Sequence, residues 1–411
     1  MGMQNWSKNV DFNDREFYQP ESLAELQELV RSNQKIRARG TAHCFNEIAN
    51  TSSYALNLAK MPKVIEVNAQ IPSVKVSSGL TYGELAPILH NQGWALNNLA
   101  SLPHISIAGS ISTGTHGSGI KNQNLANQVL SLDIVTAAGN LQNIDRANPA
   151  FNALVVGLGL GGIVYQYELK VEPTFMIRQV IYPEIPLDIL QRNFDQIMGT
   201  AYSVSYFTDW GSDRVGNLWC KFRDDEVIPE SVGGINQADK KYHPIPSVDP
   251  VACTEQLGEA GDWHQRLSHF KLEFTPSVGE EIQTEFFIDR KDAAAAIEAL
   301  SQLSNEITPL LWITELRTIA ADHLWLSGAY ERDTLGIHFT WKKLDAIYPV
   351  IEKVESALRP FNYRPHWGKV FTADAQYLST VYPKMSEFKA LIAGLDPTKK
   401  FENTFTRRIF N

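Results

Sequence analysis

Two stretches of small residues could hold an anion through their backbone N–H groups. The first is Arg39-Gly-Thr-Ala-His43-Cys-Phe-Asn46, a turn between a short predicted strand and a loop. The second is Ala108-Gly-Ser-Ile-Ser-Thr-Gly-Thr-His-Gly-Ser-Gly119. Successive N–H groups in such turns form a concave nest that binds phosphate oxygens. Because one α/β unit separates the two stretches, they could grip one elongated diphosphate cofactor from both sides.

The second stretch lies inside a segment without charged side chains. Residues 85–120 contain no Asp, Glu, Lys or Arg, although these types make up 20% of the chain. The segment is not a membrane helix, because Asn97, Asn98, Pro103 and a tail rich in Gly, Ser and Thr interrupt it. Two interpretations are open at this point: an interior β-rich segment, or backbone that closely lines a buried ligand.

A third glycine-rich stretch, Gly157-Leu-Gly-Leu-Gly-Gly162, has the spacing of a dinucleotide-binding fingerprint. That fingerprint requires a helix after the glycines, with its N-terminus at the pyrophosphate. Here apolar and polar residues alternate over 163–171, which is the period of a strand. We therefore do not expect a nicotinamide site of the Rossmann type, and we interpret the glycines as allowing tight packing before that strand.

Polar side chains at a strand spacing occur in the second half of the chain. Glu315 and Arg317 lie two residues apart in one predicted strand, and His338 and Thr340 lie two apart in a later one. Residues spaced by two on a strand point to the same face of the sheet. Lys369 follows a His-Trp-Gly turn. The Glu-x-Arg pair also has an ordinary interpretation as a surface salt bridge. Lys369 also has one, as a lysine whose side chain reaches solvent.

The composition disfavours several classes of function. The 411 residues include 37 Lys and Arg against 46 Asp and Glu, and the net charge of −9 argues against a nucleic-acid partner. Three scattered cysteines, and histidines such as His264 and His269 that are not on one helical face, predict no metal site. We find no secretory signal and no apolar run long enough to span a membrane. We expect a cytoplasmic monomer that binds a small molecule of little charge.

An α+β arrangement is predicted to position these motifs. Ser22 followed by Glu25 predicts a capping box that begins a helix, and Thr81 is predicted to cap another. The predicted strands of the first third cover residues 35–39, 64–67, 74–77, 129–136 and 162–172. The pattern changes near residue 176, where a single helix over 185–203 is predicted before a series of strands and helices. We divide the chain into residues 1–175, residues 176–370, and a segment 371–411 that returns to the first domain.

Together these motifs resemble those of a known family, the FAD-dependent oxidases of the vanillyl-alcohol oxidase type. The two small-residue stretches are similar to that family's flavin-binding pair. Residues 98–104, 315–317, 338–340 and 366–369 are most similar to its bacterial members that oxidise alditols such as xylitol and sorbitol. The resemblance implies an α+β fold with an FAD-binding domain of the PCMH type. A substrate-binding (cap) domain would follow, with an antiparallel sheet flanked by helices.

The resemblance implies covalent FAD, with the imidazole of His43 joined to the flavin 8α-methyl group. Without the resemblance, His43 is interpreted as a turn histidine that hydrogen-bonds its own loop, and Cys44 is in neither case a second tether. The residues implied to bind FAD, largely through backbone, are Ala38, Arg39, Gly40, Thr41, Ala42, His43, Cys44, Ser101, Ser106, Gly109, Ser110, Ile111, Ser112, Thr113, His116, Ser118 and Val164. The charge-free segment is then the wall against the flavin, because a carboxylate there would repel the phosphates.

For the substrate, the resemblance implies a neutral polyol, held by Ser101, Glu315, Arg317, Thr340 and Lys369. Lys369, Arg317 and His338 are the implied catalytic residues. An alcohol is about as weak an acid as water, with a pKa of ~16, so hydride loss is easier when the hydroxyl proton leaves in concert. Out of water and beside Arg317, Lys369 is expected to have a lowered pKa. It could act as the base, or stabilise a developing alkoxide together with Arg317.

The implied reaction moves a hydride from C1 of the alditol to flavin N5, gives the aldose, and reduces O2 to H2O2. Ala100 is small, which would leave room for O2 and favours an oxidase over a dehydrogenase. One alternative is an oxidase or dehydrogenase of gulono-, galactono- or arabinonolactone, which shares a Glu-x-Arg pair and a His-Trp-x-Lys-like motif. Another, from a different class, is a catalytically silent protein that binds polyols on the same fold.

Overall fold

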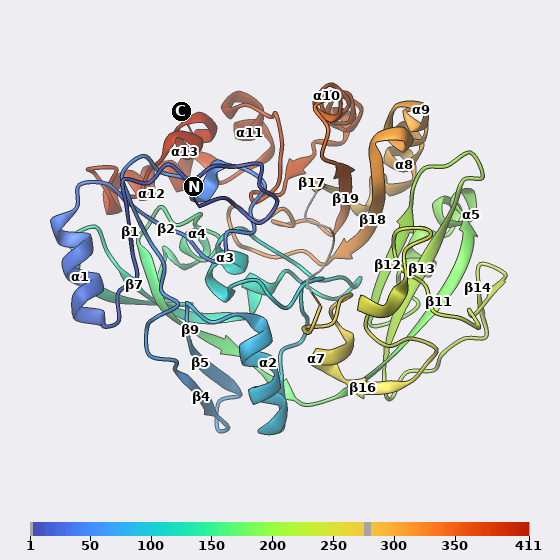
Figure 1. Ribbon diagram of the computed structural model, residues 1–411, viewed down its shortest axis with the longest axis horizontal. Coiled ribbons are helices and arrows are strands. Elements are labelled where there is room, and N and C mark those ends of the chain that lie inside the picture. Colours follow the sequence, from blue (N-terminus) through green and yellow to red (C-terminus); the bar gives the residue numbers. More distant parts are fainter. Residues whose placement is uncertain (1–2, 275–280, 411) are drawn as a thin grey trace.

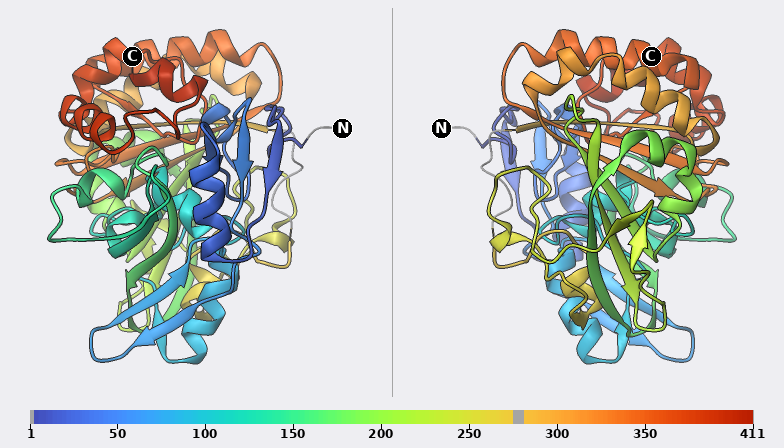
Figure 2. Two further views of the ribbon diagram at one scale, coloured as in Figure 1. Left: turned by 90° about the vertical axis from the view of Figure 1, so that its left-hand side faces the viewer. Right: turned by 90° about the vertical axis from the view of Figure 1, so that its right-hand side faces the viewer.

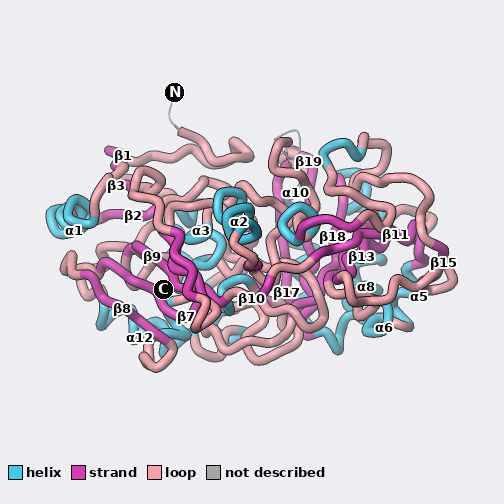
Figure 3. Tube along the Cα trace, turned by 90° about the horizontal axis from the view of Figure 1, so that it is seen from below, coloured by secondary structure: helices cyan, strands magenta, loops and turns pink. Residues whose placement is uncertain are grey.

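The computed structural model describes residues 3–274 and 281–410. Within these residues, two large antiparallel sheets lie toward opposite ends of the long axis of the molecule (Figures 1 and 3). The first has the strand order β4-β5-β9-β7-β8, and the second has the order β16-β11-β13-β12-β18-β19-β17-β20. The predicted α+β class, with helices flanking antiparallel sheets, is confirmed.

The first region of the chain combines a small parallel sheet with the five-stranded sheet. The small sheet has the order β1-β3-β2. The strands and helices of this region are β1 (Glu16–Tyr18), α1 (Leu23–Ser32), β2 (Ile36–Ala38), β3 (Tyr54–Leu56), β4 (Ile65–Asn68), β5 (Ser73–Ser77), α2 (Tyr82–Asn91), β6 (Trp94–Ala95), α3 (Ile107–Ser112), β7 (Val129–Val135), β8 (Leu141–Asp145), α4 (Phe151–Leu154), β9 (Ile163–Lys170) and β10 (Glu172–Pro173). As predicted, the glycines at 157–162 precede a strand and not a helix.

Both predicted helix starts are confirmed, but only one forms a complete capping box. Thr81 accepts a hydrogen bond from the Glu84 N–H and donates its own N–H to the Glu84 carboxylate. Ser22 accepts from the Glu25 N–H at 3.2 Å, whereas the Glu25 carboxylate reaches the N–H of Glu21 instead. A side-chain acceptor for a free N–H is enough to fix a helix start.

The second region is built on the eight-stranded sheet. Its elements are β11 (Met176–Pro186), α5 (Leu187–Arg192), α6 (Phe194–Met198), β12 (Ser203–Thr208), β13 (Val215–Arg223), β14 (Ser231–Val232), β15 (Ile235–Asn236), β16 (Ala260–Asp262), α7 (Trp263–Arg266), β17 (Glu281–Asp289), α8 (Ala293–Ser301), α9 (Ser304–Ile307), β18 (Leu311–Ile319), β19 (Thr334–Lys342), α10 (Ile347–Leu358) and β20 (Arg364–Pro365). Helices α8 and α10 lie along one side of β17–β19 (Figure 1). Leu316, Ile337 and Phe286 are buried in the core that these helices share with the sheet.

The prediction of one helix over residues 185–203 is wrong. Strand β11 continues to Pro186, and the helical part is divided into α5 and α6 at Asn193. The side-chain amide of Asn193 donates to the carbonyl of Ile189 at 3.0 Å. Asparagine side chains compete in this way with the backbone hydrogen bonds that would continue a helix. The apolar periodicity was therefore correct, and the break is a local effect.

The last part of the chain lies against the first region, and Figure 2 shows its helices beside the N-terminal strands. It contains α11 (Ala375–Val381), α12 (Met385–Leu395) and α13 (Thr404–Phe410). The Ile36 N–H donates to the carbonyl of Lys400 at 3.0 Å, and the Arg37 guanidinium donates to the carbonyl of Phe401 at 2.9 Å. The Asn403 amide donates to three carbonyls between residues 47 and 50. These bonds fix the strand that precedes the 39–46 turn.

Among the described residues, no helix has both the length and the apolar composition needed to cross a membrane.

Candidate active site

An elongated space runs between the two regions as two adjoining cavities. The first, of about 300 Å³, lies among residues 37–41, 77–81, 106–113 and 158–164 of the first region. The second, of about 610 Å³, extends to the open face of the eight-stranded sheet. They share the lining residues Gly40, Thr41, Cys44, Ala49, Ser106, Gly109 and Thr113. Both stretches of small residues predicted to act together therefore line the same space.

The turn over residues 39–46 is held from behind. The Arg39 guanidinium pairs with Asp14 and lies 3.7 Å from the ring centroid of Phe12, and Ala42 adopts a left-handed conformation with φ of 57°. The Phe45 N–H donates to the carbonyl of Gly368 at 2.7 Å. Within the described residues, the N–H groups of positions 40–44 find no protein acceptor, although these residues line the cavities. A row of free N–H groups at a cavity wall is what a diphosphate requires.

The two small-residue stretches touch each other, which explains the need for glycine. A Cβ atom at Gly40 would lie 2.2 Å from the Ser106 Oγ atom. The Ser106 N–H donates to the Thr41 hydroxyl at 3.2 Å, and Ser106 caps α3 through the N–H of Gly109. The charge-free segment that contains Ser106 contributes lining residues to both cavities, as the ligand-wall interpretation predicts.

Most residues expected to contact FAD line one cavity or both. Ala38, Arg39, Ser112 and Val164 line the first cavity; Ala42, His43, Ser101, Ser110 and His116 line the second. Of the described residues in that set, Ile111 and Ser118 line neither. Ile111 is buried in the core, and the Ser118 hydroxyl lies 2.6 Å from that of Ser203. These two positions support the wall and do not form its surface.

His43 stands at the second cavity with its ring 4.7 Å from that of Trp6. Burial, with the charge of Lys369, lowers the pKa of His43 to about 3, so the imidazole is neutral at pH 7. A neutral imidazole keeps a nucleophilic nitrogen lone pair, which a bond to an electrophilic carbon requires. Burial raises the pKa of the neighbouring Cys44 thiol to about 11, which keeps it protonated.

The open face of the eight-stranded sheet supplies the charged groups of the second cavity. His338 of β19 lies between Glu315 of β18 and Glu285 of β17, and Thr340 lies beside Gln283. The predicted sharing of a face by Glu315 with Arg317, and by His338 with Thr340, is confirmed because all four line this cavity. Glu285 and Gln283 also line the cavity, but they are not among the site residues predicted from the sequence. The signal that could have found them is the placing of polar residues at every second position, 281, 283 and 285, of a strand.

Arg317 is the centre of an ionic cluster. Its guanidinium donates to Glu285 at 2.8 Å and to the Ser101 hydroxyl at 3.3 Å, and lies 3.5 Å from Glu315. His116 Nε2 lies 3.0 Å from the same Glu285 oxygen. His116, which is expected to contact FAD, therefore also contacts the ionic cluster. Although burial alone would raise the pKa of each carboxyl, the Arg317 charge lowers the pKa of Glu285 and Glu315 well below the usual range. Both are therefore ionised acceptors at neutral pH.

Lys369 reaches the same cluster from the turn after β20. Its ammonium contacts the Gln283 side-chain oxygen and lies 3.3 Å from His338 Nε2. Burial and the Arg317 charge lower the pKa of Lys369, against an opposing effect of Glu285. Burial and the charge of Lys369 also lower the pKa of His338 to about 3, so that ring is neutral at pH 7.

A chain of buried groups stands behind Glu315, and none of it was predicted from the sequence. The Glu315 carboxylate meets His269 Nε2 at 2.8 Å, and the Nδ1 atom of that ring lies 3.2 Å from the Lys221 ammonium. Lys221 also donates to the carbonyl of Ser268 at 3.0 Å. His269 comes from a connecting segment and Lys221 from β13, so only the fold brings them to Glu315.

Comparisons with known proteins agree with this geometry. A family model described as an FAD binding domain matches residues 16–145, and one described as D-arabinono-1,4-lactone oxidase matches residues 276–409. The chain is 40% identical over 411 residues to an alditol oxidase of a Streptomyces species, with 99% of this chain and 98% of the relative covered. The chain belongs to the alditol oxidase family of FAD-dependent oxidoreductases.

More distant relatives of this alditol oxidase family member act on lactones. It is 25% identical to an L-gulono-1,4-lactone dehydrogenase of Mycobacterium tuberculosis, with 95% of this chain and 94% of the relative covered. Among solved structures, a cholesterol oxidase from B. sterolicum superposes with a TM-score of 0.79 at 15% identity, covering 99% of this chain and 96% of that one. A solvent-stable cholesterol oxidase reaches 0.81 at 16% identity, with coverage of 99% and 97%. These two likenesses establish the fold, and the family match over residues 16–145 confirms the expected FAD-binding domain.

The residues of this alditol oxidase family member fit FAD on their own geometry. Within the described residues, the N–H groups of positions 40–44 have no protein acceptor, and these residues line the cavities. The carboxylate that lines the first cavity, Glu84, is paired with Lys63. The adjoining cavities give the elongated shape that a dinucleotide needs. The ionic cluster lies only in the second cavity, so that end is suited to the reacting part of the cofactor and to a substrate.

Proposed function

We propose that this protein oxidises the C1 carbinol of an alditol such as xylitol or sorbitol to the aldose, with O2 reduced to H2O2. The observation that carries the proposal is the ionic cluster at the cavity that His43 also lines. It consists of Glu315, Arg317 and Glu285 on one sheet face and Lys369 from the turn after β20. The 40% identity to an alditol oxidase supports the same substrate class. When bound, FAD supplies the hydride acceptor and the site at which O2 is reduced.

The substrate cavity suits a neutral chain of hydroxyl groups. Each hydroxyl both donates and accepts, so its recognition needs ionised acceptors next to cationic donors. Glu315 supplies acceptor oxygens, Arg317 and Lys369 supply donors, and the Thr340 and Ser101 hydroxyls supply either. Apolar side chains such as Trp312, Ile313 and Phe207 complete the lining. An unpaired buried polar group costs ~1–3 kcal/mol, so a substrate that lacked one of these hydroxyls would bind more weakly.

Proton removal is the task that we assign to Lys369. Because its pKa is lowered, Lys369 loses its proton more readily than an ordinary lysine, and as the amine it accepts the C1 hydroxyl proton at Nζ. Arg317, held by two carboxylates, keeps its charge and stabilises the developing alkoxide. His338 is neutral and hydrogen-bonds to the side-chain oxygen of Gln283 at 3.1 Å. It thereby orients the same oxygen to which Lys369 donates. Its part in the reaction is thus to position Lys369 through Gln283.

We further propose that the flavin is bound covalently through His43 and that Ala100 leaves room for O2. The neutral ring of His43 supports the first, and the place of Ala100 in the second cavity supports the other. The division into domains at residues 175 and 370, the monomeric state and the cytoplasmic location stay predictions. A denatured gel band that fluoresces under ultraviolet light, and that turns dark in His43→Ala, is the expected sign of the bond. A dark wild-type band from flavin-replete protein would contradict it.

The second candidate function is the oxidation of an aldonolactone. The match of residues 276–409 to a lactone oxidase family model favours it, because that segment holds most of the ionic cluster. A lactone offers a ring carbonyl as well as hydroxyls, so the cationic groups could hold it in the same cavity. The catalytically silent binding protein, the third alternative, predicts no flavin reduction by either class.

Anaerobic flavin reduction by a panel of substrates separates these functions. We expect xylitol and sorbitol to bleach the flavin absorbance, and H2O2 to appear when air is admitted. Bleaching by gulono- or galactonolactone but not by polyols would replace the proposal by the second candidate. If no member of either class bleaches the flavin, the protein is a binding protein.

A further inference from the structure

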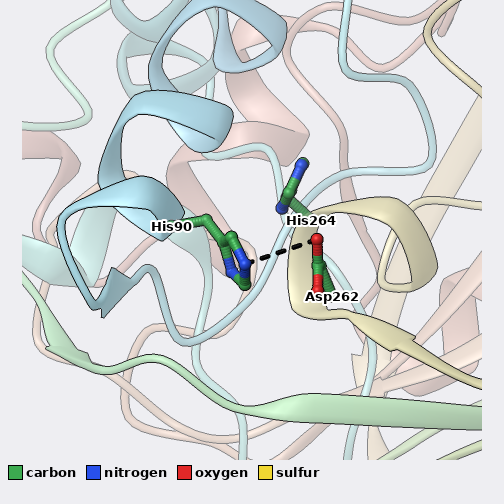
Figure 4. A group of neighbouring side chains, drawn as sticks. All are labelled: His90, Asp262 and His264. Carbon is green, nitrogen blue, oxygen red and sulfur yellow. Dashed lines mark ion pairs between the residues drawn. The ribbon is translucent and has the colours of Figure 1, made fainter.

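Three side chains that could bind a metal meet at the junction of the two regions. His90 lies in the last turn of α2, Asp262 ends β16, and His264 belongs to α7 (Figure 4). Each offers one ligand atom, and these atoms all lie within 4.8 Å of one another. No signal of this group is visible in the sequence, because His90 is far along the chain from Asp262 and His264.

The distances suit a tetrahedral ion. His90 Nε2 and Asp262 Oδ2 are 3.3 Å apart. Two ligand atoms that each lie ~2.0–2.1 Å from a tetrahedral zinc ion are separated by roughly 3.3–3.4 Å. Figure 4 shows the His264 ring next to the other two side chains, and its Nδ1 atom is buried without a hydrogen-bond partner among the described residues. The His90 and Asp262 ligand atoms are therefore already at the spacing of two zinc ligands. The His264 ligand nitrogen lies within 4.8 Å of both, so a short movement of its ring would bring it to the same ion.

The groups around the three side chains hold them in ligand orientation. The Thr174 hydroxyl lies 2.9 Å from His90 Nδ1, so it can accept a hydrogen bond from an Nδ1–H group and leave Nε2 free to bind a metal. Trp263, between Asp262 and His264, is fully buried, and its backbone N–H donates to the carbonyl of Phe175 at 3.2 Å. Second-shell acceptors and a rigid backbone of this kind are typical of metal sites.

We propose that His90, Asp262 and His264 form a zinc site, with water as the fourth ligand, that fastens α2 of the first region to α7 of the second. Two imidazoles and one carboxylate are a ligand set that zinc accepts in proteins. In the described part of the chain, none of the three residues lines either cavity of the candidate active site. The ion therefore stabilises the contact between the regions and takes no part in the oxidation.

Zinc titration of untagged, chelator-treated flavoprotein tests the proposal. We expect one equivalent of Zn²⁺ to bind, and Co²⁺ in its place to show the intense visible absorption of a tetrahedral site. His90→Gln and His264→Gln should each weaken zinc binding about 100-fold, and Thr174→Val should weaken it about tenfold through the loss of the second-shell acceptor. His323→Gln, which changes an exposed histidine elsewhere, is the matched control and should leave the affinity unchanged.

The readouts also distinguish a structural ion from an adventitious one. Saturating zinc should raise the unfolding temperature of the wild type and of His323→Gln but not of His264→Gln, because an ion that binds only the folded state stabilises it. The initial rate of polyol-dependent flavin reduction should not depend on zinc. Equal zinc affinity in the wild type and the two ligand variants would overturn the site. Loss of flavin reduction after chelation would overturn the structural role. Asp262→Asn, which keeps the shape of the side chain, replaces either histidine variant if that variant does not fold.

Discussion

The two cavities are built to recognise their occupants by opposite means. The first presents backbone N–H groups and many small side chains, several of them from the charge-free segment, and its shape depends on the contact between Gly40 and Ser106. The second presents the side chains of buried strands, and its charges depend on one another through Arg317. Binding in the first cavity should thus be sensitive to atoms added at the Gly40–Ser106 contact. Binding in the second should be sensitive to the loss of a charged side chain that partners Arg317. Substitutions of the two kinds should have different effects in the two places.

The largest effect is expected where a side chain performs chemistry. Lys369→Met keeps the length of the side chain and removes the amine, so flavin reduction by xylitol should slow by about 10²–10⁴-fold, the usual contribution of a general base. Stopped-flow absorbance at saturating polyol measures the rate, and the absorbance ratio of flavin to protein should stay at the wild-type value. Reduction within about threefold of the wild-type rate would refute the role of Lys369.

The pH dependence of the same step sharpens this assignment. The base must be deprotonated, and the pKa of Lys369 is lowered from its ordinary 10.5 by burial and Arg317. The reduction rate should therefore rise with pH through a single ionisation below 10.5 and then level off. That ionisation should be missing from the residual activity of Lys369→Met. A rate that falls over this range would show that the charged ammonium is the active form.

A smaller effect is expected from a substrate acceptor. Glu315→Gln keeps the shape but removes the charge that balances Arg317, and kcat/KM for xylitol should fall by about 10–100-fold, as for the loss of a hydrogen bond to a charged group. Glu306→Gln is a matched control, because Glu306 pairs with Lys353 at the surface. Thr340→Val should lose about tenfold. Equal kinetics for Glu315→Gln and Glu306→Gln would place the substrate elsewhere.

The cofactor end of the space should respond to a single added methyl group. A Cβ atom at Gly40 would displace the Ser106 hydroxyl and cost the cap of α3, so Gly40→Ala should weaken FAD binding about fivefold, as expected from ~1 kcal/mol for a lost cap. FAD titration in a His43→Ala background measures the affinity. The control is Gly394→Ala, where nothing lies within 4 Å of the added atom. An equal loss of FAD affinity in Gly40→Ala and Gly394→Ala would show that the contact between Gly40 and Ser106 has no special role in FAD binding.

The same contrast explains what the sequence alone could predict. The cofactor wall was visible as a segment without charge, and the pairs 315/317 and 338/340 were visible because a strand has a period of two. The partners of Arg317 and Glu315 were not visible. Glu285 comes near Arg317 through the order of the strands in the sheet, and His269 meets Glu315 from a connecting segment that only the tertiary fold places there. The break at Asn193 was missed because apolar periodicity does not report a side chain that bonds the backbone.

The smallest effect on the rate is expected from Lys221, a buried residue that supports Glu315 through His269. Burial lowers the pKa of Lys221 from 10.5 to about 7, so between these values the unfolded chain binds a proton that the folded chain has lost. Stability must then rise with pH across this window, since it rises wherever the unfolded state binds more protons. Lys221→Met should flatten that rise, while kcat changes only about twofold through the position of Glu315. Unfolding temperatures measured from pH 7 to 10 test the slope. An unchanged slope in Lys221→Met would mean that the Lys221 ammonium keeps its proton in the folded protein. The positive charge of Lys221 would then be part of the charge balance around Glu315.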